Sequence, residues 1–225
     1  MKRVFAPLIL VLCLVALAGC RTEHHWRQKT TLTVETPAGP RSGSSVVEVT
    51  ALFGKLPLTG NEVEYSFHGE ATVVEIMPGR YLFALLGGSE ERFYRAARDR
   101  FTGMHRRDWL YEIPKQTEPV ALTGKQMPWL VTFDDVRDPK TVRQVDPANL
   151  AASFGPGVTL TSITLAITDE PRTSGKLKSV LGWIDQAKFI TPPEQQPRLG
   201  SDQTFEQRLM RQDFIDRRSL QEMRD

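Results

Sequence analysis

The chain has 225 residues, of which 40% are hydrophobic, and its 29 basic residues nearly balance its 27 acidic ones. A chain this close to neutrality lacks the excess of positive charge on which binding to nucleic acid depends, so nucleic acid is not an expected partner. The apolar content is enough for a hydrophobic core, and two cysteines leave little scope for disulfide bonds to support it.

The N-terminal segment, residues 1–19, has the parts of a secretory signal. Lys2 and Arg3 precede an uninterrupted apolar run, Val4–Ala18, which ends in small residues. The 15 residues of this run are fewer than the ~20 that a helix needs to cross a bilayer. We therefore expect residues 1–19 to be a cleaved signal peptide and not a transmembrane helix.

The last residues of this segment, Leu17-Ala18-Gly19-Cys20, resemble the lipobox of bacterial lipoprotein precursors. The resemblance implies a diacylglyceryl group on the Cys20 sulfur, cleavage between Gly19 and Cys20, and acylation of the new amino group by a fatty acid such as palmitate. Two or more acyl chains anchor a protein durably, whereas one holds it only reversibly. Cys13 lies in the removed segment, so Cys20 would be the one thiol of the mature chain.

The residue after the lipobox bears on the choice of membrane. In lipoproteins of bacteria with two membranes, an Asp at this place is the usual signal for retention in the inner membrane, and here the residue is Arg21. The resemblance therefore implies the outer membrane, with the body of the protein in the periplasm. The alternative is an ordinary signal peptide that happens to be followed by a cysteine.

Residues 20–30 are expected to form a polar tether between the lipid and the fold. The adjacent His24 and His25 do not predict a metal site, because neighbouring residues do not converge on one ion without further ligands. Trp26 is expected to rest at the membrane interface, where tryptophan is common.

From Thr31 onward, apolar and polar residues alternate with a period of two, which predicts strands. Glycine and proline turns separate these strands about every ten residues, as is typical of an antiparallel sheet, a sandwich or an open barrel. The strands expected in this half of the chain are 31–35, 46–53, 63–68, 71–77 and 81–86.

The second half is expected to mix helices with strands. Ser89 is a plausible N-cap for a helix over Glu90–Phe101, in which Phe93 and Ala97 share one face with Phe101. Asp146 and Pro147 likewise predict the start of a short helix. The remaining elements expected are strands at 109–113, 120–122, 129–133 and 158–168 and helices at 146–154 and 177–184.

These elements predict a strand-rich α+β fold, an antiparallel meander or sandwich over residues 31–190 with two or three short helices. Residues 191–204 are rich in Pro, Gln and Gly and predict a linker. Residues 205–225 balance acids against arginines around a narrow apolar stripe, which predicts a marginal helix at the end of a flexible tail. Because this tail would bury little apolar surface, we expect residues 191–225 to be separable from the fold.

The run Phe133–Ile167, which includes Asp134-Asp135-Val136-Arg137-Asp138-Pro139-Lys140, is similar to segments of uncharacterised bacterial proteins. This similarity implies no function and carries no site.

Asp134, Asp135 and Asp138, with Asp146 farther on, are the densest carboxylates of the chain. Their spacing is not that of an EF-hand, and turn and helix-cap roles account for all of them. A periplasmic hydrolase that uses Asp134, Asp135 and Asp138 with a metal ion is the alternative. Neither a nucleophile elbow nor a phosphate-loop pattern is present in the sequence, so no catalytic residue, metal or cofactor is expected.

The chain has one concentration of basic residues, interleaved with aromatic residues. Arginine beside aromatics is favoured at protein interfaces, so the hypothesis is a site for an envelope protein or for an anionic glycan or lipid. A solvated helix face with local ion pairs is the alternative interpretation. The candidate partner-binding residues are Arg92, Arg95, Arg106, Arg107 and Trp109. The sequence thus favours a non-enzymatic, lipid-anchored envelope protein that binds or scaffolds a partner.

Overall fold

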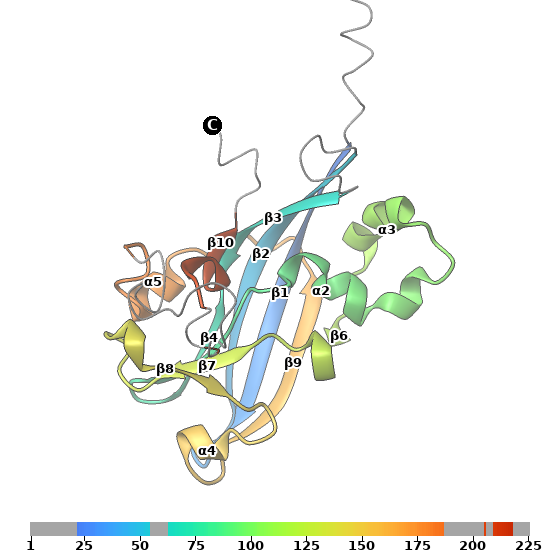
Figure 1. Ribbon diagram of the computed structural model, residues 1–225. Helices are drawn as coiled ribbons and strands as arrows, with labels where there is room; N and C mark the ends of the chain where they lie inside the picture. The colour runs from blue at the N-terminus through green and yellow to red at the C-terminus, as the bar shows by residue number, and fades with distance from the viewer. Residues whose placement is uncertain (1–21, 55–62, 187–204, 206–208, 218–225) are drawn as a thin grey trace, which may run out of the picture.

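The computed structural model describes residues 22–54, 63–186, 205 and 209–217, and for Glu90, Arg106 and Arg217 only the backbone. The lipobox and the cleavage site at Gly19 and Cys20 lie outside the described residues. The described chain is rich in strands, which form two antiparallel sheets accompanied by four short α-helices (Figure 1). None of the described helices is long and apolar enough to span a bilayer.

The larger sheet has six strands in the order β10-β3-β2-β1-β9-β6. Its centre is the long hairpin of the first two strands, which pair from Thr22 opposite Phe53 to Val34 opposite Arg41. A tight turn connects them, in which the Gly39 amide donates to the Thr36 carbonyl over 2.8 Å. The strands of this sheet are β1 (Thr22–Glu35), β2 (Arg41–Phe53), β3 (Val63–Glu70), β6 (Val120–Ala121), β9 (Thr159–Ile167) and β10 (Ile215–Arg217).

The smaller sheet, in the order β4-β5-β7-β8, packs against the larger one. Its strands are β4 (Thr72–Met77), β5 (Arg80–Ala84), β7 (Leu130–Phe133) and β8 (Val142–Val145). Because side chains alternate along a strand, Val74 and Leu82 face the core shared with Val34 and Val49 of the larger sheet. The opposite face of the smaller sheet is also apolar, so it needs a second cover.

Helix α5 (Lys176–Val180) and residues 209–217 supply that cover. Phe214 is fully buried, and its ring lies 6.4 Å from the ring of Phe83 and 6.1 Å from that of Phe133. The buried Glu70 carboxylate holds α5 in place by accepting hydrogen bonds from the Gly175 and Leu177 amides, at 2.5 and 2.8 Å. The fold therefore has three layers: the larger sheet, the smaller sheet, and α5 with the C-terminal segment.

The remaining helices lie between strands β5 and β9 in the sequence. They are α2 (Ser89–Ala96), η1 (Arg98–Phe101), α3 (Arg106–Glu112), η2 (Ile113–Lys115), η3 (Gly124–Gln126), η4 (Pro139–Thr141) and α4 (Ala151–Phe154), and η6 (Arg211–Asp213) follows in the C-terminal segment.

The strand-rich α+β class is confirmed, and most of the strands expected from alternation are present, although β1 and β2 begin earlier than expected and the strand expected at 109–113 is absent. One correction concerns residues 20–30, because β1 begins at Thr22 and leaves no room for a tether of that length. The inward side of this stretch includes polar residues, among them the buried Gln28 and Thr30, so its alternation is hidden from a hydrophobicity pattern. Trp26 is buried too, and its indole N–H donates to Gln28, so it is not at an interface with lipid.

Three further corrections concern helices. The strand expected at 109–113 is helix α3 and the first residue of η2, in which Trp109, Leu110 and Ile113 are buried at helical spacing. The single helix expected over Glu90–Phe101 is divided at Ala97, where α2 ends and the tighter η1 follows. The helix expected from Asp146 begins only at Ala151.

The described part of the C-terminal segment corrects the expectation of a separable tail. Leu209 and Phe214 are fully buried, and β10 pairs with β3 along the edge of the larger sheet. Residues 187–204, 206–208 and 218–225, on which the rest of that expectation falls, lie outside the described residues.

Candidate functional site

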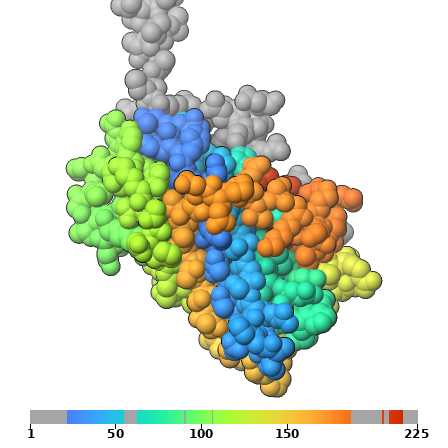
Figure 2. All heavy atoms as spheres, turned by 180° about the vertical axis from the view of Figure 1, so that it is seen from behind, coloured from blue at the N-terminus to red at the C-terminus, as the bar shows by residue number. Residues whose placement is uncertain are grey.

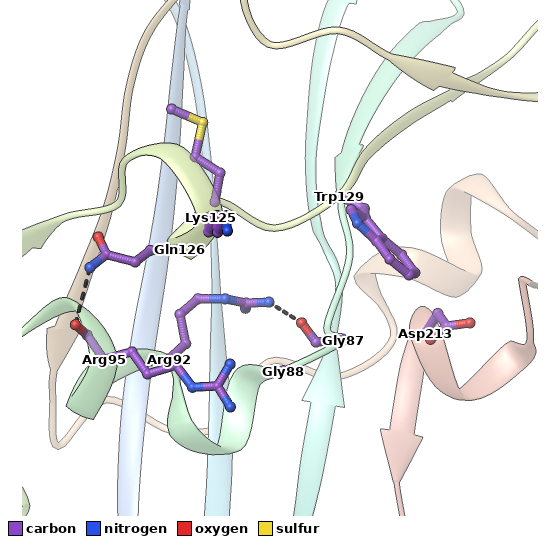
Figure 3. A pocket seen from close by; sticks show the side chains of 9 residues that line it. Gly87, Gly88, Arg92, Arg95, Lys125, Gln126, Trp129 and Asp213 are labelled. Carbon is purple, nitrogen blue, oxygen red and sulfur yellow. Dashed lines mark hydrogen bonds between the residues drawn. The ribbon is translucent and has the colours of Figure 1, made fainter. Parts of the chain in front are cut away.

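A pocket of about 360 Å³ opens beside α2 and is lined by residues from four separate parts of the chain (Figure 3). Its lining comes from α2 and the loop that precedes it, from η3 and the residue that follows it, from the residue before β7, and from η6. The lining residues are Gly87, Gly88, Arg92, Arg95, Lys125, Gln126, Met127, Trp129 and Asp213.

Helix α2 contributes Arg92, whose guanidinium is fixed in place. The helix starts directly after Gly88, which adopts the left-handed conformation (φ 75°) that glycine allows at low cost. The Arg92 side chain folds back over this start and donates to the Gly87 carbonyl and, over 3.0 Å, to the Ser89 hydroxyl. Arg92 is only 6% exposed, so a positive charge lies at the wall of the pocket in a fixed position.

Arg95 lies one turn farther along α2 and is exposed. Its guanidinium pairs with Glu91 over 2.7 Å, an i,i+4 contact that adds little stability at a surface. The Arg95 backbone carbonyl accepts a hydrogen bond of 3.0 Å from the side-chain amide of Gln126, which connects α2 to η3 (Figure 3).

The opposite wall combines a cation with an aromatic ring. Lys125 of η3 is exposed and has no hydrogen-bond or ion-pair partner within the described part of the chain. Trp129, just before β7, is 48% exposed, and the Phe205 ring supports it edge-on at 5.1 Å. The exposed indole presents a flat aromatic surface in the same pocket lining as the Lys125 ammonium.

The C-terminal segment closes the pocket with Asp213. The Asp213 carbonyl accepts a hydrogen bond from the Leu86 amide over 2.8 Å, which joins η6 to the end of β5. Its carboxylate accepts from the Met210 amide over 2.7 Å. Three cationic side chains thus line the pocket with one carboxylate, and the pocket suits an anionic group that lies next to a flat apolar surface.

The structure brings together two of the residues singled out from the sequence and places Arg107 and Trp109 elsewhere. Arg92 and Arg95 line the pocket, whereas Arg107 lies over the Phe53 ring at 6.0 Å and does not line it. Trp109 is 2% exposed and stacks on Tyr94 at 4.2 Å, so it offers no surface to a partner. The side chain of Arg106 lies outside the described residues.

The carboxylates considered for metal chemistry are engaged in local contacts. Asp135 accepts two hydrogen bonds from the Arg137 side chain and one from its amide, which together lower the pKa of Asp135 to about 2. Asp134 pairs with Arg143 over 2.5 Å, and Asp138 accepts from the Lys140 amide over 2.9 Å. Among the described residues, no three His, Cys, Asp or Glu side chains gather in a way that could hold a metal ion.

Sequence reasoning did not identify Lys125, Trp129 or Asp213 as site residues. Trp129 stands at the start of an apolar run that predicted a buried strand, and Asp213 lies in the segment expected to be a tail. A tryptophan close in sequence to Lys125 and Gln126 is only a weak indication of a site. The pocket itself forms only when α2 packs against η3.

Comparison with known proteins yields no family model, no curated protein and no solved structure that matches this chain.

Proposed function

We propose that this protein is a non-enzymatic lipoprotein of the bacterial envelope, anchored through Cys20 in the outer membrane. Its body faces the periplasm and uses the pocket beside α2 to bind an acidic segment of another envelope protein. The anchor is supported by the resemblance of Leu17-Ala18-Gly19-Cys20 to a lipobox and by a mature chain with Cys20 as its one thiol.

The observation that carries the binding role is the composition of the pocket. Arg92, Arg95 and Lys125 provide positive charge, and the half-exposed Trp129 and Met127 provide apolar surface in the same lining. Tryptophan, arginine and methionine are enriched at the centres of protein interfaces, and tryptophan and arginine dominate their binding energy. This set favours a protein partner over a glycan or a lipid.

No second function is proposed. The Asp134, Asp135 and Asp138 groups are engaged by Arg143, by Arg137 and by a backbone amide, and no specific observation favours metal-assisted hydrolysis there.

The test is co-purification from envelope extracts with the double variant Arg95→Glu and Lys125→Glu. We expect the variant to lose a captured acidic protein by about tenfold or more, because two attractive charges become repulsive. Lys140→Glu with Arg172→Glu is the matched control, since both side chains are exposed and lie outside the pocket lining. A thermal melt checks that Arg95→Glu, which loses its partner Glu91, leaves the fold intact; if it does not, Lys125→Glu is used alone.

Equal capture by the pocket variant and the control would contradict the binding role of the pocket. Capture that persists after the extract is digested with protease, and is lost after digestion of glycans, would show an anionic glycan as the partner instead. Cys20→Ser in the same strains tests the anchor separately, because it should abolish acyl labelling and move the protein out of the membrane fraction.

A further inference from the structure

The strand β1 begins very close to the residue proposed as the membrane anchor. Thr22 is already paired with Phe53 in the larger sheet, and Cys20 is two residues earlier in the sequence. Two residues span at most about 7 Å even when fully extended. If Cys20 carries the lipid, which is part of the proposed function, the end of the sheet at Thr22 lies within that distance of the lipidated residue and therefore close to the bilayer surface.

Helix α3 lies at this same end of the molecule. The ring of His24, two residues after the start of β1, contacts the Tyr111 ring edge-on at 4.3 Å. Arg107 lies over Phe53, the partner of Thr22 across the sheet. In Figure 2 the dark-blue start of β1 and the green region that contains α3 occupy one end of the molecule, side by side.

The side chains exposed at this end suit the headgroup region of a bilayer. Tyr111 is 45% exposed, and tyrosine favours the depth at which its ring is in apolar surroundings and its hydroxyl is in water. Arg107 is exposed and can reach lipid phosphates through its long stem. The acid Glu23 lies 3.4 Å from the His25 ring, which offsets part of the repulsion between Glu23 and anionic lipids when the imidazole is protonated.

We infer that the surface formed by the start of β1 and by α3 rests on the membrane, with Arg107 and Tyr111 in the headgroup layer of anionic phospholipids. The occupant of this surface is the lipid bilayer, because the length of chain before Thr22 leaves no room for a protein partner between them. The body of the protein therefore has a fixed orientation, with the start of β1 toward the membrane, and is not connected to its anchor by a long flexible linker.

The opposite end of the molecule provides an internal control. Helix α4 precedes β9, whose first residue, Thr159, pairs with Glu35 at the far end of β1 (Figure 1). The 14 residues of β1 span about 43 Å, so α4 is held well away from the bilayer in this orientation.

The experiment uses the mature chain, Cys20–Asp225, coupled through its one thiol to a maleimide-bearing lipid. Vesicles of phosphatidylethanolamine and phosphatidylglycerol are compared with vesicles of phosphatidylcholine, and with the uncoupled protein. Amide hydrogen exchange is followed for peptides that cover α3 and α4. On anionic vesicles we expect exchange in α3 to slow by about threefold or more while exchange in α4 stays unchanged. Protection of α3 should be weaker on phosphatidylcholine.

The variant Arg107→Glu with Tyr111→Ser should reduce the protection of α3, and Lys140→Glu with Tyr81→Ser is its control away from the anchored end. Unchanged exchange in α3 on coupling, or protection of α4 instead, would overturn the inference. Chemical coupling does not depend on acylation in the cell. A failed inference is therefore distinguishable from a failed proposal of lipidation, which acyl labelling of Cys20→Ser tests.

Discussion

At the scale of single residues, the main departure from expectation is polar groups on the inward side of β1. His24, Gln28 and Thr30 are buried where a hydrophobicity pattern expects apolar residues. Gln28 is satisfied, because its amide accepts from Trp26 and donates to the Ser89 carbonyl over 2.7 Å. His24 differs, since its Nε2 has no hydrogen-bond partner within the described part of the chain.

The His24 side chain makes stability depend on pH. Burial lowers the pKa of His24 below its usual 6.5, and the neighbouring charges of His25 and Arg107 lower this pKa further. As the pH is lowered, His24 therefore takes up a proton in the unfolded chain at a higher pH than in the folded chain. The free energy of unfolding is unaffected by His24 well above its ordinary pKa and decreases as the pH falls below that pKa. We expect the melting temperature, measured in a series of calorimetric scans, to decrease as the pH is lowered from 7.5 to 5.

His24→Leu should make that pH dependence shallower, because the group that charges on unfolding is gone. The exposed His105 provides a control, since His105→Gln should keep the dependence of the unmodified protein. A curve for His24→Leu that parallels that of the unmodified protein would contradict this account.

At the scale of elements, the C-terminal segment is where sequence reasoning fails most. Residues 205–225 carry five acids and five arginines around a narrow apolar stripe, a pattern that predicts a marginal helix at the end of a flexible tail. Leu209 and Phe214 nevertheless fill a hydrophobic cluster with Phe83 and Phe133. That apolar face exists only after β4, β5, β7 and β8 have assembled, so no local pattern in residues 209–217 could reveal it.

Phe214→Ala should destabilise the protein by about 3–5 kcal/mol, because it removes a buried ring and leaves a cavity. Urea unfolding measures this loss, with Gln212→Ala as the control from the same segment. Gln212 is exposed, so its substitution should change the free energy of unfolding by less than about 0.5 kcal/mol. A Phe214→Ala loss as small as that of the control would restore the interpretation as a separable tail.

At the scale of the whole molecule, the fold class follows from local signals and the arrangement of the layers does not. Alternation and turns predict most of the strands, because period-two patterns mark half-buried strands. The pairing of Gln28 with Ile167, or of Ile215 with Glu70, joins segments far apart in the sequence. Arg92 and Arg95 could be singled out because they belong to a local concentration of arginines. Their position in one pocket with Lys125, Trp129 and Asp213 could not be predicted, because these residues are brought together only by the folding of distant segments.

The two sheets approach closely at Gly43 of β2. A Cβ added there would collide with the backbone carbonyl of Val73 in β4, so glycine is needed for the backbones to pass. Gly43→Ala should destabilise by about 1–3 kcal/mol or more through overpacking, measured by denaturant unfolding. Gly182→Ala is the control, because nothing lies within 4 Å of a Cβ placed there. Equal stability of the two variants would mean that the sheets can separate at this point without cost.

The position of β1 in the sequence limits the order in which the strands of this protein can pair. As the chain emerges, β1 can pair with β2, and β2 then with β3, but the other edge of β1 waits for β9, more than a hundred residues later. Until then β1 is a long strand with one open edge, and open edges recruit other chains into aggregates. Such distant pairing also slows folding. Folding of this chain therefore passes through an interval, before β9 is available, in which protection by a chaperone is most valuable.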